Sequence, residues 1–116
     1  MARPHYRLKA WKGAMMLVKS VYQVTRTFPH EEIYGLTAQM RRAGVSIPSN
    51  LAEGAARAGP KEFAQFVNIA SGSLSELETQ LLISVELGYL DRANKIFDQA
   101  DEVSALLAGL YRSIAK

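Results

Sequence analysis

The paired arginines Arg41 and Arg42 are the side chains whose types and spacing best suit a chemical role. They lie in the segment 36–57, which also ends on an arginine, Arg57. An arginine presents a planar fork of N–H donors that can hold a phosphate or a carboxylate at two points. Contacts of this kind give affinity for a polyanion without reading a base sequence, and they weaken as salt rises. The arginines therefore indicate that the protein binds an anionic partner.

Further basic residues precede this segment. Lys12, Lys19 and Arg26 recur at intervals of seven, which predicts a basic line along the outer side of a helix. Residues 1–58 hold nine Lys or Arg against three Glu, a balance of +6, whereas residues 59–116 hold five against eight acidic residues, a balance of −3. A basic face of this kind attracts RNA or DNA. A solvated surface that serves solubility alone explains the same charges.

Catalytic patterns are absent from the sequence. It contains no cysteine, which excludes disulfides, zinc–thiolate sites and thiol nucleophiles. Its two histidines, His5 and His30, are not in the Glu-x-x-His pattern of a carboxylate-bridged metal site. No G-x-S-x-G arrangement accompanies the serines. We therefore predict a protein that is not an enzyme and that uses no metal and no cofactor.

The segment 36–57 reads as one helix despite an internal proline. Its apolar residues recur at steps of three and four, which is typical of a helix with one buried face. Pro48 removes a backbone donor and crowds the carbonyl of Gly44, but the glycine relieves part of that strain, so we expect a kink near Pro48 and not a break. If the helix were broken, Asn50 and Glu53 would be spaced as a capping box for its restart.

Polar residues around Pro48 are predicted to have structural roles. Asn50 is expected to point inward and to hydrogen-bond the carbonyl that Pro48 leaves without a donor. Glu53 and Arg57 are four residues apart, and can pair along the helix. With Gly54, these residues form a structural motif around the kink. An enzyme site built from Asn50, Glu53 and Arg57 is the least favoured alternative, because no nucleophile or cofactor motif accompanies them.

Proline and glycine signals divide the chain into four helices. We predict helices over about 8–27, 30–58, 61–87 and 91–114, with Asp91 as the cap of the last one. Short connections require each helix to run antiparallel to the one before it. The fold class is therefore all-α, an antiparallel up-down-up-down four-helix bundle that occupies residues 1–116 as a single domain.

The first helix carries a wider apolar arc than one core face needs. One of its stripes comprises Trp11, Met15, Val18, Tyr22 and Thr25. This surplus predicts self-association, for which Tyr22, Tyr34 and Tyr111 are candidate interface residues. The alternative is that these aromatic residues close the ends of the monomer's own core. In the third helix, Ser71-Gly72-Ser73 is expected to let a neighbouring helix approach closely.

No segment approaches the roughly 20 uncharged apolar residues that cross a bilayer. Lys12 and Lys19 interrupt the apolar run near the N-terminus, which argues against a signal peptide. We therefore expect a cytoplasmic protein with no membrane partner.

Several motifs together resemble a known family. They are F-P-x-E-E-x-Y-G-L-T-x-Q-x-R-R-A over 28–43, S-I-P-S-N-L-A-E-G over 46–54, the pattern E-F-x-Q-F that opens the third helix, and L-G-Y-L over 87–90. These motifs are similar to those of the four-helix-bundle proteins of the 23S rRNA intervening-sequence family. The similarity covers about nine tenths of the chain.

The resemblance implies a bacterial bundle that assembles as a homopentamer and has no assigned catalytic residue. The family is in turn similar to accessory proteins of diversity-generating retroelements, whose basic pentameric barrels bind nucleic acid and a reverse transcriptase. The leading hypothesis is therefore an oligomeric bundle of unknown biological role that binds RNA or DNA through a basic surface. The alternative is a protein-interaction scaffold that does not contact nucleic acid.

Overall fold

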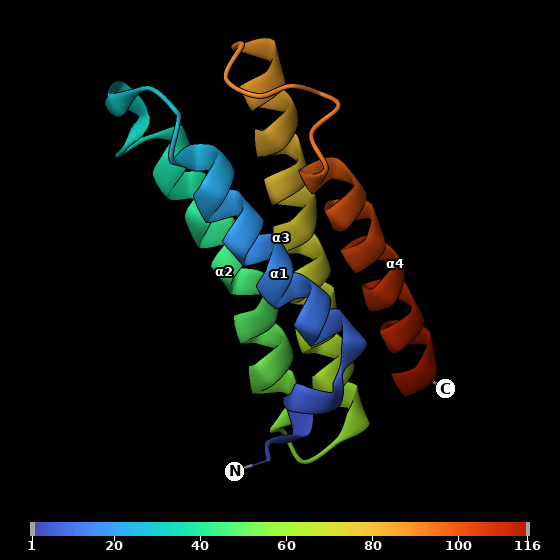
Figure 1. The fold of residues 1–116 in the computed structure, drawn as a ribbon. Helices are drawn as coiled ribbons and strands as arrows, with labels where there is room; N and C mark the ends of the chain where they lie inside the picture. The colour runs from blue at the N-terminus through green and yellow to red at the C-terminus, as the bar shows by residue number, and fades with distance from the viewer. Residues whose placement is uncertain (1, 116) are drawn as a thin grey trace.

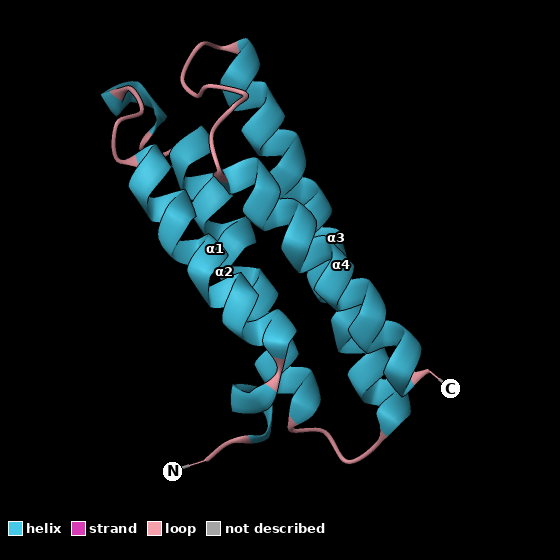
Figure 2. Ribbon diagram, turned by 45° about the vertical axis from the view of Figure 1, so that its right-hand side comes forward, coloured by secondary structure: helices cyan, strands magenta, loops and turns pink. Residues whose placement is uncertain are grey.

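Four long helices account for most of the chain in the computed structural model, which describes residues 2–115. They are α1 (Lys9–Thr25), α2 (Leu36–Ala55), α3 (Pro60–Glu86) and α4 (Ile96–Ile114). Two short 3-10 helices, η1 (Pro4–Arg7) and η2 (His30–Glu32), precede α1 and α2. The described residues contain no strand. Each long helix packs against the next one, and α4 returns to α1 (Figures 1 and 2), which confirms the predicted all-α bundle.

Contacts between opposite helix ends show that neighbouring helices run in opposite directions (Figure 1). The Ser84 hydroxyl near the end of α3 donates to the Met40 sulfur near the start of α2, over 3.5 Å. At the other end of the same pair, Gly54 lies against Phe66. This arrangement follows from short connections, which leave each helix too little chain to cross the bundle before it turns back.

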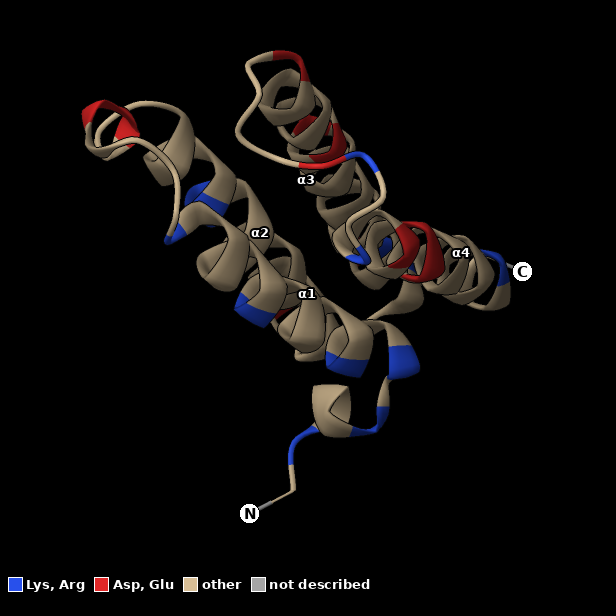
Figure 3. Cartoon of the chain, turned by 45° about the horizontal axis from the view of Figure 1, so that its top comes forward, with Lys and Arg blue, Asp and Glu red and all other residues tan. Residues whose placement is uncertain are grey.

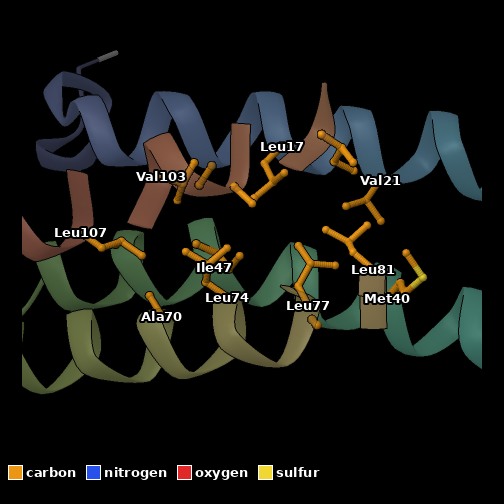
Figure 4. Packing of buried hydrophobic residues seen from close by; sticks show 14 of the residues in the cluster. Leu17, Val21, Met40, Ile47, Ala70, Leu74, Leu77, Leu81, Val103 and Leu107 are labelled. Carbon is orange, nitrogen blue, oxygen red and sulfur yellow. The ribbon is translucent and has the colours of Figure 1, made fainter. Parts of the chain in front are cut away.

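The core lies along the axis between the four helices. Leu17, Ile47, Leu77 and Leu107 come one from each helix, and each is at most 1% exposed. Figure 4 shows these side chains converging with their neighbours on one continuous apolar cluster. They occupy the apolar stripes of the sequence, because residues three and four apart share one face of a helix.

The second helix begins later than predicted. The predicted start near residue 30 is wrong: residues 30–32 form η2, and α2 begins at Leu36. Gly35 separates them with a non-helical ψ of −114°. A carboxylate oxygen of Glu32 accepts the Leu36 N–H over 3.1 Å, so the side chain satisfies a donor at the helix start while its own backbone stays outside the helix.

The last helix also begins later than predicted, at Ile96 and not at residue 91. Asp91 is not its cap, because its carboxylate accepts the Ala93 N–H within the preceding turn, over 2.8 Å. The side-chain oxygen of Asn94 accepts the Ile96 N–H instead, over 2.9 Å. Before this turn, Gly88 ends α3 with a left-handed φ of +80°, a conformation that favours glycine.

The second helix continues through Pro48 without a break and ends at Ala55, three residues before the predicted end. The predicted role of Asn50 toward Pro48 is wrong. Its amide donates to the Ser46 carbonyl and to the Ser46 hydroxyl, each over 2.8 Å, and not to the Gly44 carbonyl. Gly44 itself faces α1, where an added Cβ would lie 3.5 Å from Val21. The predicted ranges of the first and third helices agree with α1 and α3 to within two residues.

Candidate functional site

Arg41 is held in place by two residues of α1. Its Nε donates to the Thr25 hydroxyl over 3.0 Å, and its guanidinium lies over the Tyr22 ring at 4.4 Å from the ring centre. Thr25 is only 3% exposed and donates in turn to the Val21 carbonyl over 2.7 Å. The sequence indicated Arg41 but did not reveal that Thr25 holds it in place. The one sign of such a role was that Thr25 puts a hydroxyl group on an apolar stripe of the helix. Arg41 is thus both a candidate anion ligand and a link between α1 and α2.

The basic line predicted on α1 is exposed. Lys12, Lys19 and Arg26 all face solvent, and none forms an ion pair with another described residue. Figure 3 shows Lys and Arg along α1 and in the segment before it, while Asp and Glu are prominent on α4 and at the end of α3. The charge asymmetry of the sequence therefore becomes an asymmetry between regions of the bundle.

The region between α3 and α4 carries acidic side chains. Burial raises the pKa of the Glu78 carboxyl above its ordinary value, and the negative charge of Asp101 on α4 raises it further. Like charges disfavour the ionised form, so the part of this shift that comes from Asp101 reflects the acidic side chains that α3 and α4 bring close together in this region. Such a region repels a polyanion that approaches from this side.

Arg42 lies away from the basic line of α1. It is exposed and lines a groove of about 590 Å³ with Arg41, Tyr22, Val45 and Glu76. The carboxylate of Glu76 on α3 makes this groove mixed in charge. Arg42 therefore belongs to the α2–α3 side of the bundle, and the structure does not bring it together with Lys12 and Lys19.

Arg57 lies at the far end of α2 and is already paired. Its guanidinium is 2.9 Å from the Glu53 carboxylate, the one ion pair between side chains of residues 2–115, and this confirms the predicted pairing. The guanidinium also lies over the Phe66 ring at 5.1 Å. Both partners of the ion pair are about half exposed, so the pair contributes only about 0.3–0.5 kcal/mol. Arg57 is the weakest of the predicted anion ligands.

A polar link between α2 and α3 surrounds Asn50. The Ser46 hydroxyl, which accepts from Asn50, is also 2.8 Å from the Ser73 hydroxyl of α3. Ser73 therefore takes part in the close helix contact that the small residues 71–73 predicted. Gly72 does not, because no atom lies within 4 Å of a Cβ added to Gly72. The Asn50 amide bonds within this link and Glu53 pairs with Arg57, so the three residues of the enzyme alternative do not converge on a common site.

Glu32 joins two motifs that are far apart in the sequence. One oxygen caps α2, and the other accepts the Tyr89 hydroxyl over 3.0 Å. This hydrogen bond raises the pKa of the Tyr89 hydroxyl above its ordinary value, and desolvation and the charges of Glu32 and Glu31 raise it further. The Tyr89 ring also packs on Phe28 at 5.3 Å. The sequence assigned no role to Tyr89, because nothing local reveals a partner 57 residues away.

The three candidate interface tyrosines have different surroundings. Tyr34 is 97% exposed, and Tyr22 is 39% exposed beneath the Arg41 guanidinium. Tyr111 is half-buried and packs against the core cluster of its own chain. Tyr22 and Tyr34 are therefore available for contact with another molecule, whereas Tyr111 contributes to the monomer.

The described part of the chain, residues 2–115, offers neither a membrane-spanning helix nor a metal-binding cluster. None of the helices there combines the length and apolar character needed to cross a membrane. Within the same range, no group of three or more His, Asp or Glu side chains is arranged to hold a metal ion.

Comparison with known proteins supports the resemblance of the motifs. A search among curated proteins finds no match to the chain. The family described as 23S rRNA-intervening sequence protein matches residues 6–109, which span all of α1, α2 and α3 and most of α4. The chain therefore belongs to the 23S rRNA-intervening sequence protein family.

Proposed function

We propose that this protein is a non-enzymatic, oligomeric bundle that binds RNA or DNA through the basic side of α1, without strong sequence preference. The observation that carries the proposal is the exposed line of Lys12, Lys19 and Arg26, which forms no ion pair among the described residues. Unpaired cations spaced along one helix suit a phosphate backbone, because each contact releases counterions from it.

Removing two charges from this line is expected to weaken binding and its salt dependence. For Lys12→Gln with Lys19→Gln, the slope of log K against log salt for single-stranded RNA should fall by about 1.4, since each lost phosphate contact contributes about 0.7. Fluorescence anisotropy in a salt series measures this slope.

A matched variant controls for net charge. Lys61→Gln with Lys95→Gln also removes two exposed lysines, one on α3 and one next to α4. It should leave the slope nearly unchanged. Absence of binding at low salt, or equal losses in the two double variants, would contradict the proposed surface.

Self-association is the second part of the proposal. A groove of about 370 Å³ runs between α1 and α2, and its walls are mainly apolar. Met15 and Val45 in these walls are 46% and 40% exposed. Apolar side chains grouped around a groove favour contact with another protein surface. A second copy of the chain is the proposed occupant, and a pentamer is the assembly that the family resemblance implies.

A charge in this groove is expected to dissociate the assembly. Val45→Glu places an unpaired carboxylate in a buried interface, which costs several kcal/mol. Light scattering should give a pentamer for the parent protein and a smaller species for this variant. Ile69→Glu on α3, where Ile69 is 51% exposed outside the groove, should stay assembled. A monomeric parent protein rules out the assembly, and dissociation by Ile69→Glu alone rules out this groove.

A protein-interaction scaffold is the second candidate function. It is favoured by the contacts of Arg41 within the monomer. The Arg41 guanidinium already contacts Thr25 and Tyr22, so less of it remains for a phosphate. In that case, the groove between α1 and α2 would receive a different protein. Purification with a stoichiometric protein and no nucleic-acid absorbance is the result that selects this function.

A further inference from the structure

A pocket with basic walls lies at the end of the bundle where α1 leads into α2. Its volume is about 480 Å³, and Arg26, His30 and Arg41 all line it. No Asp or Glu is among its lining residues. Phe28, Ile33 and Ala38 form an apolar wall beside the basic groups. The pocket therefore combines a charged part with an apolar part, as sites for small organic anions do.

The Arg41 side chain is preorganised by contacts within the protein. Its Nε is bound to buried Thr25 and its guanidinium is stacked on Tyr22, so the side chain has already lost much of its freedom. Within residues 2–115, no carboxylate lies within ion-pair distance of Arg41, and its two terminal nitrogens have no hydrogen-bond partner. A fork held in this way can bind an oxyanion at little further entropic cost.

Two acidic residues, Glu31 and Glu32, flank the pocket in the sequence, but neither lines it. Glu32 accepts the Leu36 N–H with one oxygen and the Tyr89 O–H with the other. By contrast, Arg26 is exposed and unpaired, and Thr37 in the pocket wall has a buried hydroxyl without a partner among the described residues. The residues that line the pocket therefore carry a net positive charge.

We infer that this pocket binds a phosphomonoester, with Arg41 and Arg26 holding the phosphate and the apolar wall contacting the organic group. The volume exceeds what a bare phosphate ion fills, and the apolar wall would contribute nothing to such an ion. A nucleoside monophosphate and the 5′-phosphorylated end of a nucleic-acid strand both carry this chemistry. The inference shares Arg26 with the proposed RNA-binding surface but uses neither Lys12 nor Lys19, so those two lysines separate the two proposals.

Calorimetry with adenosine 5′-monophosphate, at fixed ionic strength, tests the inference. The nucleotide should bind at least about tenfold more tightly than adenosine, since charged hydrogen bonds to phosphate are the stronger kind. Arg26→Gln should weaken binding of the nucleotide by about tenfold. Arg41→Gln should weaken it more, but this variant also removes the contacts to Thr25 and Tyr22, so the result for Arg26→Gln is decisive.

Arg92→Gln is the matched control, because Arg92 is also exposed and lies over an aromatic ring, that of Phe97, at 4.1 Å. It should bind the nucleotide as the parent protein does. Equal affinity for the nucleotide and adenosine, or equal losses for Arg26→Gln and Arg92→Gln, overturns the inference. The variant Lys12→Gln with Lys19→Gln should keep its affinity for the nucleotide, so the pocket and the proposed RNA-binding surface can fail separately.

Two short RNA strands that differ only in a 5′-phosphate or a 5′-hydroxyl identify the source of the ligand. Preference for the phosphorylated strand, lost in Arg26→Gln, assigns the pocket to strand ends. Equal binding of both strands, together with binding of the nucleotide that depends on Arg26, assigns it to free nucleotides. Either result supports a phosphomonoester site.

Discussion

Replacing Ile47 by alanine is expected to lower the free energy of unfolding of the monomer by about 2–5 kcal/mol. Ile47 is fully buried in α2, and Figure 4 shows its side chain in the cluster that Leu17 of α1 and Leu74 of α3 share. The substitution removes apolar contact area and leaves a cavity, which the helices close only in part because the core is densely packed. Urea unfolding followed by circular dichroism measures the loss as a lower midpoint at unchanged m value.

Val45→Ala is the matched control on the same helix. Val45 is 40% exposed, so its truncation should cost the monomer less than about 1 kcal/mol. Both variants should be compared at one protein concentration, since assembly adds to the apparent stability by mass action. A loss below about 1 kcal/mol for Ile47→Ala, or equal losses for both variants, would contradict the assignment of Ile47 to the core.

The buried stripes were predictable from the sequence because they depend on local spacing. Met40, Ile47 and Leu51 belong to the same periodic run in the sequence, and all three are fully buried in the structure. A helix face is fixed by its own 3.6-residue period, so neighbours along the chain suffice to find it. The same reasoning predicted α1 and α3 well, since a proline or glycine marks their limits.

The start of α2 could not be predicted in the same way. Pro29, Glu31 and Glu32 have the residue types of a first helical turn, and they form one, but only as a 3-10 turn. The true helix start depends on the Glu32 side chain, which accepts the Leu36 N–H. The same side chain also accepts the hydroxyl of Tyr89, which lies 57 residues further along the chain. Tertiary contacts of this kind override local preference and leave no periodic signal.

The sequence predicted which residue types form the candidate site, but not how they are arranged. The sequence identified Arg41 and Arg42 as a pair, and both line the groove of about 590 Å³ that Glu76 of α3 also lines. Arg41 is in addition fixed by Thr25, 16 residues away, and it lines a second pocket that Arg42 does not reach. The pocket that Arg41 shares with Arg26 and His30 depends on how α1 and α2 meet, which the spacing of charges does not specify.

Gly54 shows where a sequence motif encodes a tertiary contact. It closes the motif S-I-P-S-N-L-A-E-G and lies buried where α2 meets the start of α3. A Cβ added to Gly54 would lie 2.5 Å from the Phe66 Cβ and 3.1 Å from the Phe63 ring. The first distance is shorter than carbon atoms tolerate, and the Phe66 Cβ cannot move without its backbone. This glycine therefore sets how closely α2 and α3 approach.

Gly54→Ala is accordingly expected to destabilise the protein by about 1–3 kcal/mol, although alanine is the better helix former by about 1 kcal/mol. Gly72→Ala separates the two effects, because Gly72 is exposed within α3 and nothing lies within 4 Å of its added Cβ. That variant should gain up to about 1 kcal/mol from helix propensity alone. Urea midpoints that move in opposite directions identify the contact with Phe66 as the reason for glycine at position 54. Stabilisation by both substitutions would show instead that α2 and α3 can separate at little cost.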